Sequence, residues 1–252
     1  VRLVGSEMCI RDSFGRFGAY SSLVPYVNNY YVQAVVMFMI MAGGLGFMVW
    51  VELAEYRKKR HLSLHAKVVL QFSAIFWVGG AVLLALLEWS NPKTMGGLSV
   101  PSKLMAALFQ SVSTRTAGMN TIDLAACSPI SKLLMSVLQF IGAAPGSTGG
   151  GVKVTTFAVL ILTIRSVAQG RDDCVIGGHH IESKTVYRAL TIIVLGAVAA
   201  FGSAVVVYYN TAETVSVIDC IFESCSAFGT VGLSVGVTGQ LNTGAKLLYM
   251  AF

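Results

Sequence analysis

An internal repeat is the feature that most constrains the fold of this chain. Its first copy is Phe109-Gln110-Ser111-Val112-Ser113 with Thr116-Ala117-Gly118-Met119, and its second is Phe222-Glu223-Ser224-Cys225-Ser226 with Thr230-Val231-Gly232-Leu233. The copies stand 113 residues apart up to the serine and 114 residues apart from the threonine onward. The match continues further on, from Ser131-Lys132-Leu133-Leu134 to Ala245-Lys246-Leu247-Leu248. A repeat of this length is a whole structural unit rather than one turn of a solenoid.

The composition is that of a membrane protein. Of 252 residues, 55% are hydrophobic and 12% are charged, whereas a soluble domain has about 25% charged residues. The net charge of +6 comes from short basic clusters between apolar runs, which indicates membrane orientation rather than nucleic-acid binding. The five cysteines form no C-x-x-C pair, and we interpret those beyond Cys9 as small apolar packing residues.

The apolar runs predict an all-α integral membrane protein. The expected spans are Val32–Leu53, Val68–Leu87, a broken run from Ser131 to Ile164, and Ala189–Tyr209. Two shorter apolar segments, Lys103–Val112 and Thr214–Ala227, cannot cross a core of about 30 Å and are predicted to be re-entrant. The basic run Arg57-Lys58-Lys59-Arg60 places its loop in the cytoplasm.

The run from Ser131 to Ile164 has to be interrupted. As one straight helix its 34 residues would measure about 50 Å, well over the membrane thickness. The interrupting residues are Pro145, Gly146, Ser147, Thr148, Gly149, Gly150, Gly151, Val152 and Lys153. Irregular backbone at this depth is tolerated only inside protein or beside a water-filled cavity. We predict a mobile barrier in a pore, in which Lys153 places a positive charge; a packing kink and a phosphate-binding loop are the alternatives.

The repeated segments suit cation conduction, and we call Thr116, Ala117, Gly118, Met119, Thr230, Val231, Gly232 and Leu233 the two filter segments. A dehydrated cation needs a ring of oxygens, which backbone carbonyls supply where glycine permits an unusual backbone. Each short helix would point its partly negative end at the pore. The alternative, glycines that merely let outer loops turn, leaves the repeated flanking residues unexplained. Arg115 is expected to pair with a carboxylate behind the filter or to lie at the outer mouth.

With these residues in view, the chain strongly resembles the Trk/Ktr/HKT superfamily of potassium transporters, and within it the Ktr-type membrane subunit. The motifs are Gly43–Phe47, Phe109–Asp123, Gly142–Thr156 and Phe222–Ser234, and the resemblance covers roughly residues 20–252. It implies membrane-pore-membrane units around one pore, with Gly118 in the third filter part and Gly232 in the fourth. It also implies that Pro145–Lys153 is the intramembrane gate.

The resemblance divides the chain as follows. We expect residues 1–13 to be non-native, 14–53 to end the second unit, 54–67 to be a cytoplasmic loop, 68–164 to be the third unit with its broken helix, 165–188 to be a second cytoplasmic loop, and 189–252 to be the fourth unit without its closing helix. The second filter glycine is expected at Gly15 or Gly18. His179-His180 lies in the second loop without further metal-spaced ligands, and we interpret it as surface.

The resemblance also implies a function. We expect potassium uptake across the bacterial cytoplasmic (inner) membrane by a multi-pass protein that is not an enzyme and has no bound cofactor. K⁺ would bind at backbone carbonyls near Gly118 and Gly232, with Na⁺ as a candidate coupling ion for symport. The implied partners are the lipid membrane, a second pore subunit in a homodimer, and a cytosolic ring of nucleotide-binding RCK-type subunits. No nucleic-acid partner is expected.

Two other functions are alternatives to potassium uptake for this chain. A secondary transporter of another small solute would use the broken helix as a midplane site. Many such carriers need midplane acidic residues, and the predicted spans have none at the midplane apart from Glu223, which lies behind a filter segment. A membrane scaffold without transport would leave the duplicated filter segments unexplained.

Overall fold

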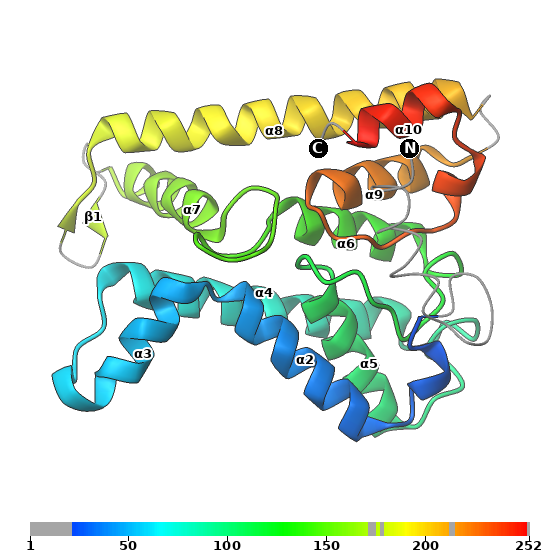
Figure 1. Ribbon diagram of the computed structural model, residues 1–252, viewed down its shortest axis with the longest axis horizontal. Helices are drawn as coiled ribbons and strands as arrows, with labels where there is room; N and C mark the ends of the chain where they lie inside the picture. Colours follow the sequence, from blue (N-terminus) through cyan, green and yellow to red (C-terminus); the bar gives the residue numbers. More distant parts are fainter. Residues whose placement is uncertain (1–21, 171–174, 177–178, 212–214, 251–252) are drawn as a thin grey trace.

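The computed structural model describes residues 22–170, 175–176, 179–211 and 215–250, and its regular elements are helices apart from one short strand pair (Figure 1). In chain order they are η1 (Val24–Tyr26), α2 (Tyr30–Gly44), α3 (Phe47–Lys59), α4 (Leu64–Glu88), α5 (Val100–Ser113), α6 (Pro129–Phe140), α7 (Val154–Ala168), β1 (Val175–Ile176), β2 (His179–His180), α8 (Ser183–Asn210), α9 (Val217–Phe228), η2 (Val237–Gln240) and α10 (Thr243–Met250). The all-α prediction is therefore confirmed.

Two of the described helices, α4 and α8, are long and apolar enough to cross a membrane, and a third span results if the bent pair α2 and α3 counts as one. In Figure 1, α6 and α7 lie between α4 and α8, and helix contacts agree with that order. Large apolar side chains remain exposed along one face of each long helix: Ile75, Val78, Val82 and Leu86 on α4, and Val194, Val198, Phe201 and Val205 on α8. Such faces suit contact with lipid tails.

The first predicted span, Val32–Leu53, is not one straight helix. It divides into α2 and α3, which meet at an angle of 98°. The break is at Gly46, whose φ of +81° is a conformation that favours glycine. A Cβ at Gly46 would lie 2.5 Å from the carbonyl oxygen of Pro145. The bend is thus the place where a distant loop packs against the backbone of this helix pair.

The predicted interruption of the third run is confirmed. Helix α6 ends at Phe140 and α7 begins at Val154, and we call the connection the 141–153 loop. Its two ends pair with each other, since the Gly142 amide donates to the Val152 carbonyl at 2.8 Å and the Val152 amide to the Phe140 carbonyl at 3.1 Å. Neither half-helix is long enough alone, because the 15 residues of α7 extend over about 22 Å.

The two short predicted helices are present as α5 and α9. A serine occupies each N-cap position, Ser99 before α5 and Ser216 before α9, and the Ser216 hydroxyl accepts a hydrogen bond from the Ile218 amide. Helix α5 packs against α4 and α2, and α9 packs against α8 and α6. A buried apolar cluster that includes Ala106, Met135 and Phe222 extends to residues just after the helices. The core therefore includes Val231 and Leu233 of the second filter segment.

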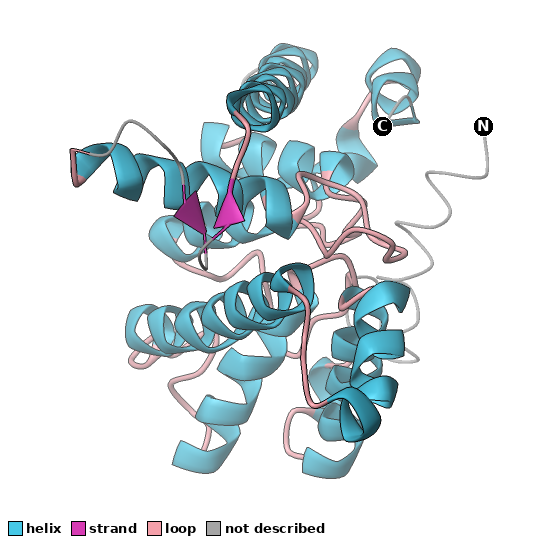
Figure 2. Cartoon of the chain, turned by 90° about the vertical axis from the view of Figure 1, so that its left-hand side faces the viewer, coloured by secondary structure: helices cyan, strands magenta, loops and turns pink. Residues whose placement is uncertain are grey.

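The polar connections are shorter than the sequence suggests. Helix α3 continues to Lys59 and α4 begins at Leu64, while α7 ends at Ala168 and α8 begins at Ser183. Lysine, arginine and glutamate are good helix formers, so a helix continues past the end of its apolar part. Between α7 and α8, β1 and β2 pair antiparallel at the end of the molecule that faces the viewer in Figure 2.

An ion pair joins α6 to α9. The Lys132 Nζ atom lies 2.7 Å from Asp219 Oδ1, and the two side chains are only 10% and 21% exposed. Lys132 belongs to one repeat unit and Asp219 to the next. The pair therefore fastens adjacent units to each other.

We predict that Lys132→Met lowers the free energy of unfolding by roughly 2 kcal/mol, because it leaves Asp219 charged and poorly hydrated. The double variant Lys132→Met/Asp219→Leu should recover most of that loss. Thermal unfolding in detergent measures both, with Lys93→Met, an exposed lysine, as the neutral control. A double variant as unstable as the single one would contradict the pairing.

Candidate functional site

The two filter segments have the same backbone conformation. In the first copy, Thr116 has φ +71° and Gly118 has φ +77°; in the second, Thr230 has φ +51° and Gly232 has φ +89°. Positive φ strains a β-branched residue, so two threonines in this region are held there by their surroundings. The repeated sequence is thus matched by a positive φ at the corresponding threonine and glycine of each copy.

A serine at the end of each short helix holds its filter segment. The Ser113 hydroxyl donates to the Met119 carbonyl, and the Met119 amide donates back to Ser113 Oγ at 2.9 Å. In the second copy, the Ser226 hydroxyl donates to the Leu233 carbonyl at 2.7 Å. Both serines are fully buried. The chain is therefore fastened just beyond each filter glycine.

The carbonyls inside the first filter segment remain free. Within the described residues, no hydrogen bond uses the carbonyl oxygens of Thr116, Ala117 or Gly118. Gly118 is buried whereas Thr116 and Ala117 are half-buried, so these carbonyls are available to an external partner, either water or an ion. The segment also follows the C-terminal end of α5, which is partly negative. Free oxygens at a negative helix end can bind a dehydrated cation.

The 141–153 loop lies directly against both filter segments. The Gly150 amide donates to Thr230 Oγ1 at 2.8 Å. On the other side, a Cβ at Gly149 would lie 2.5 Å from Thr116 Oγ1. The sequence predicts that this loop interrupts a helix; the structure adds that it meets one threonine from each filter segment.

Lys153 does not extend freely from the loop. Its Nζ atom donates to the Gly149 carbonyl, four residues earlier. The phosphate-loop alternative finds no support, because the helix α6 and not a strand precedes the loop and the lysine is engaged by the loop itself. Lys153 thus adds positive charge beside the part of the loop that touches the filter.

Arg115 differs from its prediction. It is 4% exposed and therefore does not lie at an open outer mouth. Its Nη2 donates to the Gly142 carbonyl at 2.9 Å, and its guanidinium lies 5.6 Å and 5.7 Å from the ring centroids of Phe76 and Trp77. Among the described residues, no carboxylate pairs with it. The cation instead fastens the start of the 141–153 loop, and it stacks on aromatic faces.

Glu223 has a role that sequence reasoning missed. This fully buried carboxylate accepts hydrogen bonds from the Val235 amide at 3.0 Å, the Val237 amide at 3.2 Å and the Thr238 hydroxyl at 2.7 Å, and also from Ser234. It thereby holds the chain that follows the second filter segment. Gln110, the residue at the matching place in the first copy, is buried, and neither of its side-chain polar atoms is bonded to a described residue. The sequence feature that could have indicated this role is the difference between Gln110 in the first copy and Glu223 in the second.

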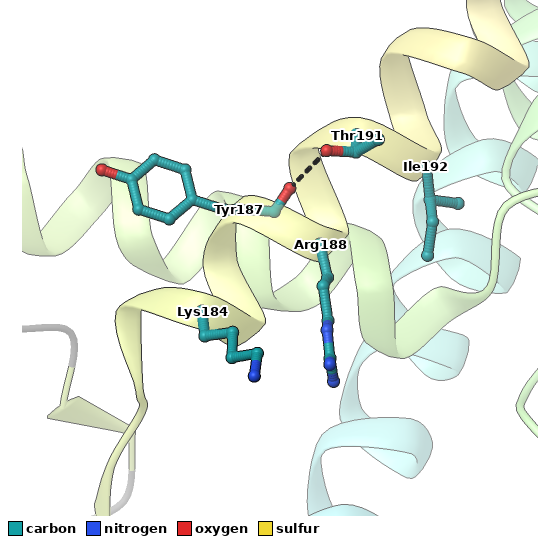
Figure 3. A pocket seen from close by; sticks show the side chains of 5 residues that line it. All are labelled: Lys184, Tyr187, Arg188, Thr191 and Ile192. Carbon is teal, nitrogen blue, oxygen red and sulfur yellow. Dashed lines mark hydrogen bonds between the residues drawn. The ribbon is translucent and has the colours of Figure 1, made fainter.

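Three further features stand apart from this site or outside the described residues. The described residues contain no group of three or more His, Cys, Asp or Glu that could hold a metal. Gly15 and Gly18, the candidates for a second filter glycine, lie outside the described residues. A surface hollow of about 690 Å³ at the start of α8 is lined by Lys184, Tyr187, Arg188, Thr191 and Ile192 (Figure 3), and no filter residue lines it.

Comparison with known proteins finds similarity to cation transport proteins. The family profile described as "TrkH: Cation transport protein" matches residues 18–252. The Ktr system potassium uptake protein B of Vibrio alginolyticus is 37% identical over 229 residues, which are 90% of this chain and 50% of that protein. The protein of the same name from Bacillus subtilis is 33% identical over 227 residues, 90% of this chain and 51% of that protein.

Two further relatives complete the comparison. The potassium/sodium uptake protein NtpJ of Enterococcus hirae is 35% identical over 232 residues, 91% of this chain and 51% of that protein. The crystal structure of the potassium transporter TrkH from Vibrio parahaemolyticus superposes with a TM-score of 0.72 at 19% identity, over 98% of this chain and 53% of that one. The chain therefore spans about half the length of these relatives.

We predict that Glu223→Ala raises amide hydrogen exchange at Val235 and Val237 by roughly three- to tenfold, because both amides lose their acceptor. Exchange measured by mass spectrometry on peptides covering residues 234–238 gives the result. Gln110→Ala is the matched control and should leave this peptide unchanged. Equal effects of the two variants would show general loosening rather than loss of the carboxylate.

Proposed function

Because this chain belongs to the TrkH family of cation transport proteins, we propose that it supplies two parts of the selectivity filter of a potassium uptake system. The family is one of transporters and not of enzymes. The observation that supports the proposal most is the pair of filter segments with matching backbone angles, each behind a short helix. Thr116, Ala117, Gly118 and Met119 form one part, and Thr230, Val231, Gly232 and Leu233 form the other.

In this proposal the backbone carbonyls near Gly118 and Gly232 replace the water shell of K⁺. The free carbonyls of the first filter segment are the supporting observation. The hydroxyls of Ser113 and Ser226 fix the segments, so that the oxygens are in place before the ion arrives. The ends of α5 and α9 add a negative potential, which favours a cation over an anion.

Potassium is the proposed transported ion. Both filter segments have glycine at the central position, and two of the relatives above are named potassium uptake proteins. The name of the Enterococcus relative includes sodium as well, so we propose Na⁺ as the candidate coupling ion for symport. No bound cofactor is part of the proposal.

We propose that the 141–153 loop is the gate, with Pro145, Gly146, Ser147, Thr148, Gly149, Gly150, Gly151 and Lys153 as its working residues. The loop touches a threonine of each filter segment, which suits a plug immediately below the filter. Four of these residues are glycines, whose wide backbone freedom suits a segment that has to move. Lys153 contributes positive charge that impedes a cation while the loop is closed.

The chain is part of a multi-pass membrane protein, as its family and apolar helices indicate. We propose the bacterial cytoplasmic membrane as its location, with the basic end of α3 and the start of α8 on the cytoplasmic side. A homodimer of pore subunits and a cytosolic ring of nucleotide-binding RCK-type subunits are the proposed partners. The division into a third and a fourth membrane-pore-membrane unit belongs to the same proposal.

A carrier with a midplane substrate site fits less well. In such a carrier the interrupted helix would leave backbone groups for the solute. Here the Gly150 amide is already bonded to Thr230, and Lys153 is bonded to Gly149. Glu223, the acidic residue behind the second filter segment, is bonded to the chain after that segment. These bonds serve a pore better than a solute site.

We predict that Gly118→Ser or Gly232→Ser abolishes potassium uptake. Both glycines have positive φ, which costs about 1–2 kcal/mol for a residue with a Cβ, and a new side chain enters the filter. The reading frame that contains this chain is expressed in potassium-uptake-deficient cells, and growth at low potassium is measured. Gly97→Ser, at a glycine with open space around it, is the control. Growth rescue by both filter variants would remove the filter assignment.

We predict that deletion of Ser147–Gly151 raises potassium flux, because it removes the part of the loop that touches the filter. Flux through the reconstituted protein, normalised to its amount in the vesicles, is the measurement. The control is deletion of a segment of similar length between β1 and α8, away from the filter. Unchanged or lower flux from well-incorporated protein would contradict the gate.

A further inference from the structure

The two halves of the 141–153 loop are held in different ways. The first half is fastened at three places outside the loop: the Gly142 carbonyl accepts from Arg115, the Ala144 amide donates to the Gly44 carbonyl at 3.0 Å, and the Gly146 carbonyl accepts from the Phe47 amide at 3.2 Å. These bonds come from Arg115, just before the first filter segment, and from the bend between α2 and α3. The first half is therefore anchored to rigid parts of the molecule.

In the second half, Val152 pairs with the other end of the loop and with Phe140, whereas residues 147–151 have one hydrogen bond to the described chain outside the loop. That bond runs from the Gly150 amide to Thr230 Oγ1 at 2.8 Å. The Ser147 and Lys153 bonds stay inside the loop, to Ala144 and Gly149. If residues 147–151 move while the paired ends of the loop stay in place, the bond from Gly150 to Thr230 is the one to the rest of the described chain that has to break.

The two filter threonines differ in this contact. Thr116 packs against Gly149 but makes no hydrogen bond to the loop among the described residues. Thr230 has a similar backbone angle and supplies an acceptor to the Gly150 amide. Close packing is therefore common to both sides, whereas the directional bond is confined to the second filter segment.

We propose that Thr230 is a latch, a residue shared by filter and gate whose hydroxyl holds the loop closed until a cation occupies the inner end of the filter. An amide N–H and a cation that approach the same hydroxyl oxygen repel each other, because both present positive charge to it. A cation on Thr230 Oγ1 thus weakens the bond from Gly150 and frees the second half of the loop. The inference rests on the proposed filter and gate, and it adds that the transported ion itself regulates the gate.

The test measures the latch directly and does not require transport. Amide exchange of peptides covering residues 145–153 is followed by mass spectrometry on the full reading frame in detergent, in N-methylglucamine chloride and in potassium chloride. Thr230→Val, which replaces the hydroxyl by a methyl group, should speed exchange by roughly three- to tenfold in N-methylglucamine. Potassium should speed exchange at least about twofold in the wild type and leave the valine variant unchanged.

Matched variants separate the latch from general loosening of the filter. Thr116→Val removes the corresponding hydroxyl of the other filter segment and should leave loop exchange as in the wild type. Thr230→Ser keeps a hydroxyl and should also behave like the wild type. Gly150→Ala breaks the bond from the loop side, because its Cβ would lie 2.6 Å from Thr230 Oγ1, and should match Thr230→Val even if that variant folds poorly.

Equal exchange in all variants, equal acceleration by Thr116→Val and Thr230→Val, or slower loop exchange in potassium would overturn the latch. Failure of the proposed function has a different signature: no potassium uptake by the wild type in vesicles, whatever the loop exchange shows. If the wild type transports potassium but loop exchange does not depend on Thr230, the proposed function stands and only the latch is refuted.

Discussion

The bond between a buried serine hydroxyl and the carbonyl beyond each filter glycine is the interaction on which the rest of this structure depends. Ser113 makes it in one copy and Ser226 in the other. Ser113 is the last residue of α5 and Ser226 lies in the last turn of α9, so the position of each helix fixes the position of its filter segment. The long helices, the buried apolar cluster and the ion pair between α6 and α9 all locate those two short helices. The stability of the fold and the geometry of the two filter segments thus depend on the same packing.

The site is assembled from elements far apart in the sequence. The 141–153 loop is gripped by the bend between α2 and α3, by Arg115 and by Thr230. The two repeat copies contribute differently: Arg115 of the first copy binds the first half of the loop, and the Thr230 hydroxyl of the second copy binds the second half. The two filter segments are therefore similar, but their contacts with the loop are not. A loop held in this way can move at its second half while its first half stays attached.

Sequence reasoning predicted the features that depend on local pattern: the repeated segments, the short helices and the interruption between α6 and α7. It failed where long-range packing decides. The bend at Gly46 lies against the backbone of Pro145 and Gly146, which are far from it in the sequence. Hydropathy alone favours a straight span at that place. Arg115 was expected to pair with a carboxylate or to lie at the outer mouth, yet it is buried and contacts a carbonyl and two aromatic rings. Glu223 was noted only as an acidic residue behind a filter, because its partners follow it by more than ten positions.

The contact at Gly46 has a consequence for how such a sequence can diverge. The obstacle to a side chain there is the carbonyl oxygen of Pro145 and the backbone of Gly146, not another side chain. Exchanging residues within the loop changes side chains but leaves that backbone in place. Drift in the loop therefore cannot compensate for a larger residue at the bend. Loop positions with open surroundings, such as Gly146, are limited by conformation alone, whereas position 46 is limited by conformation and by space together.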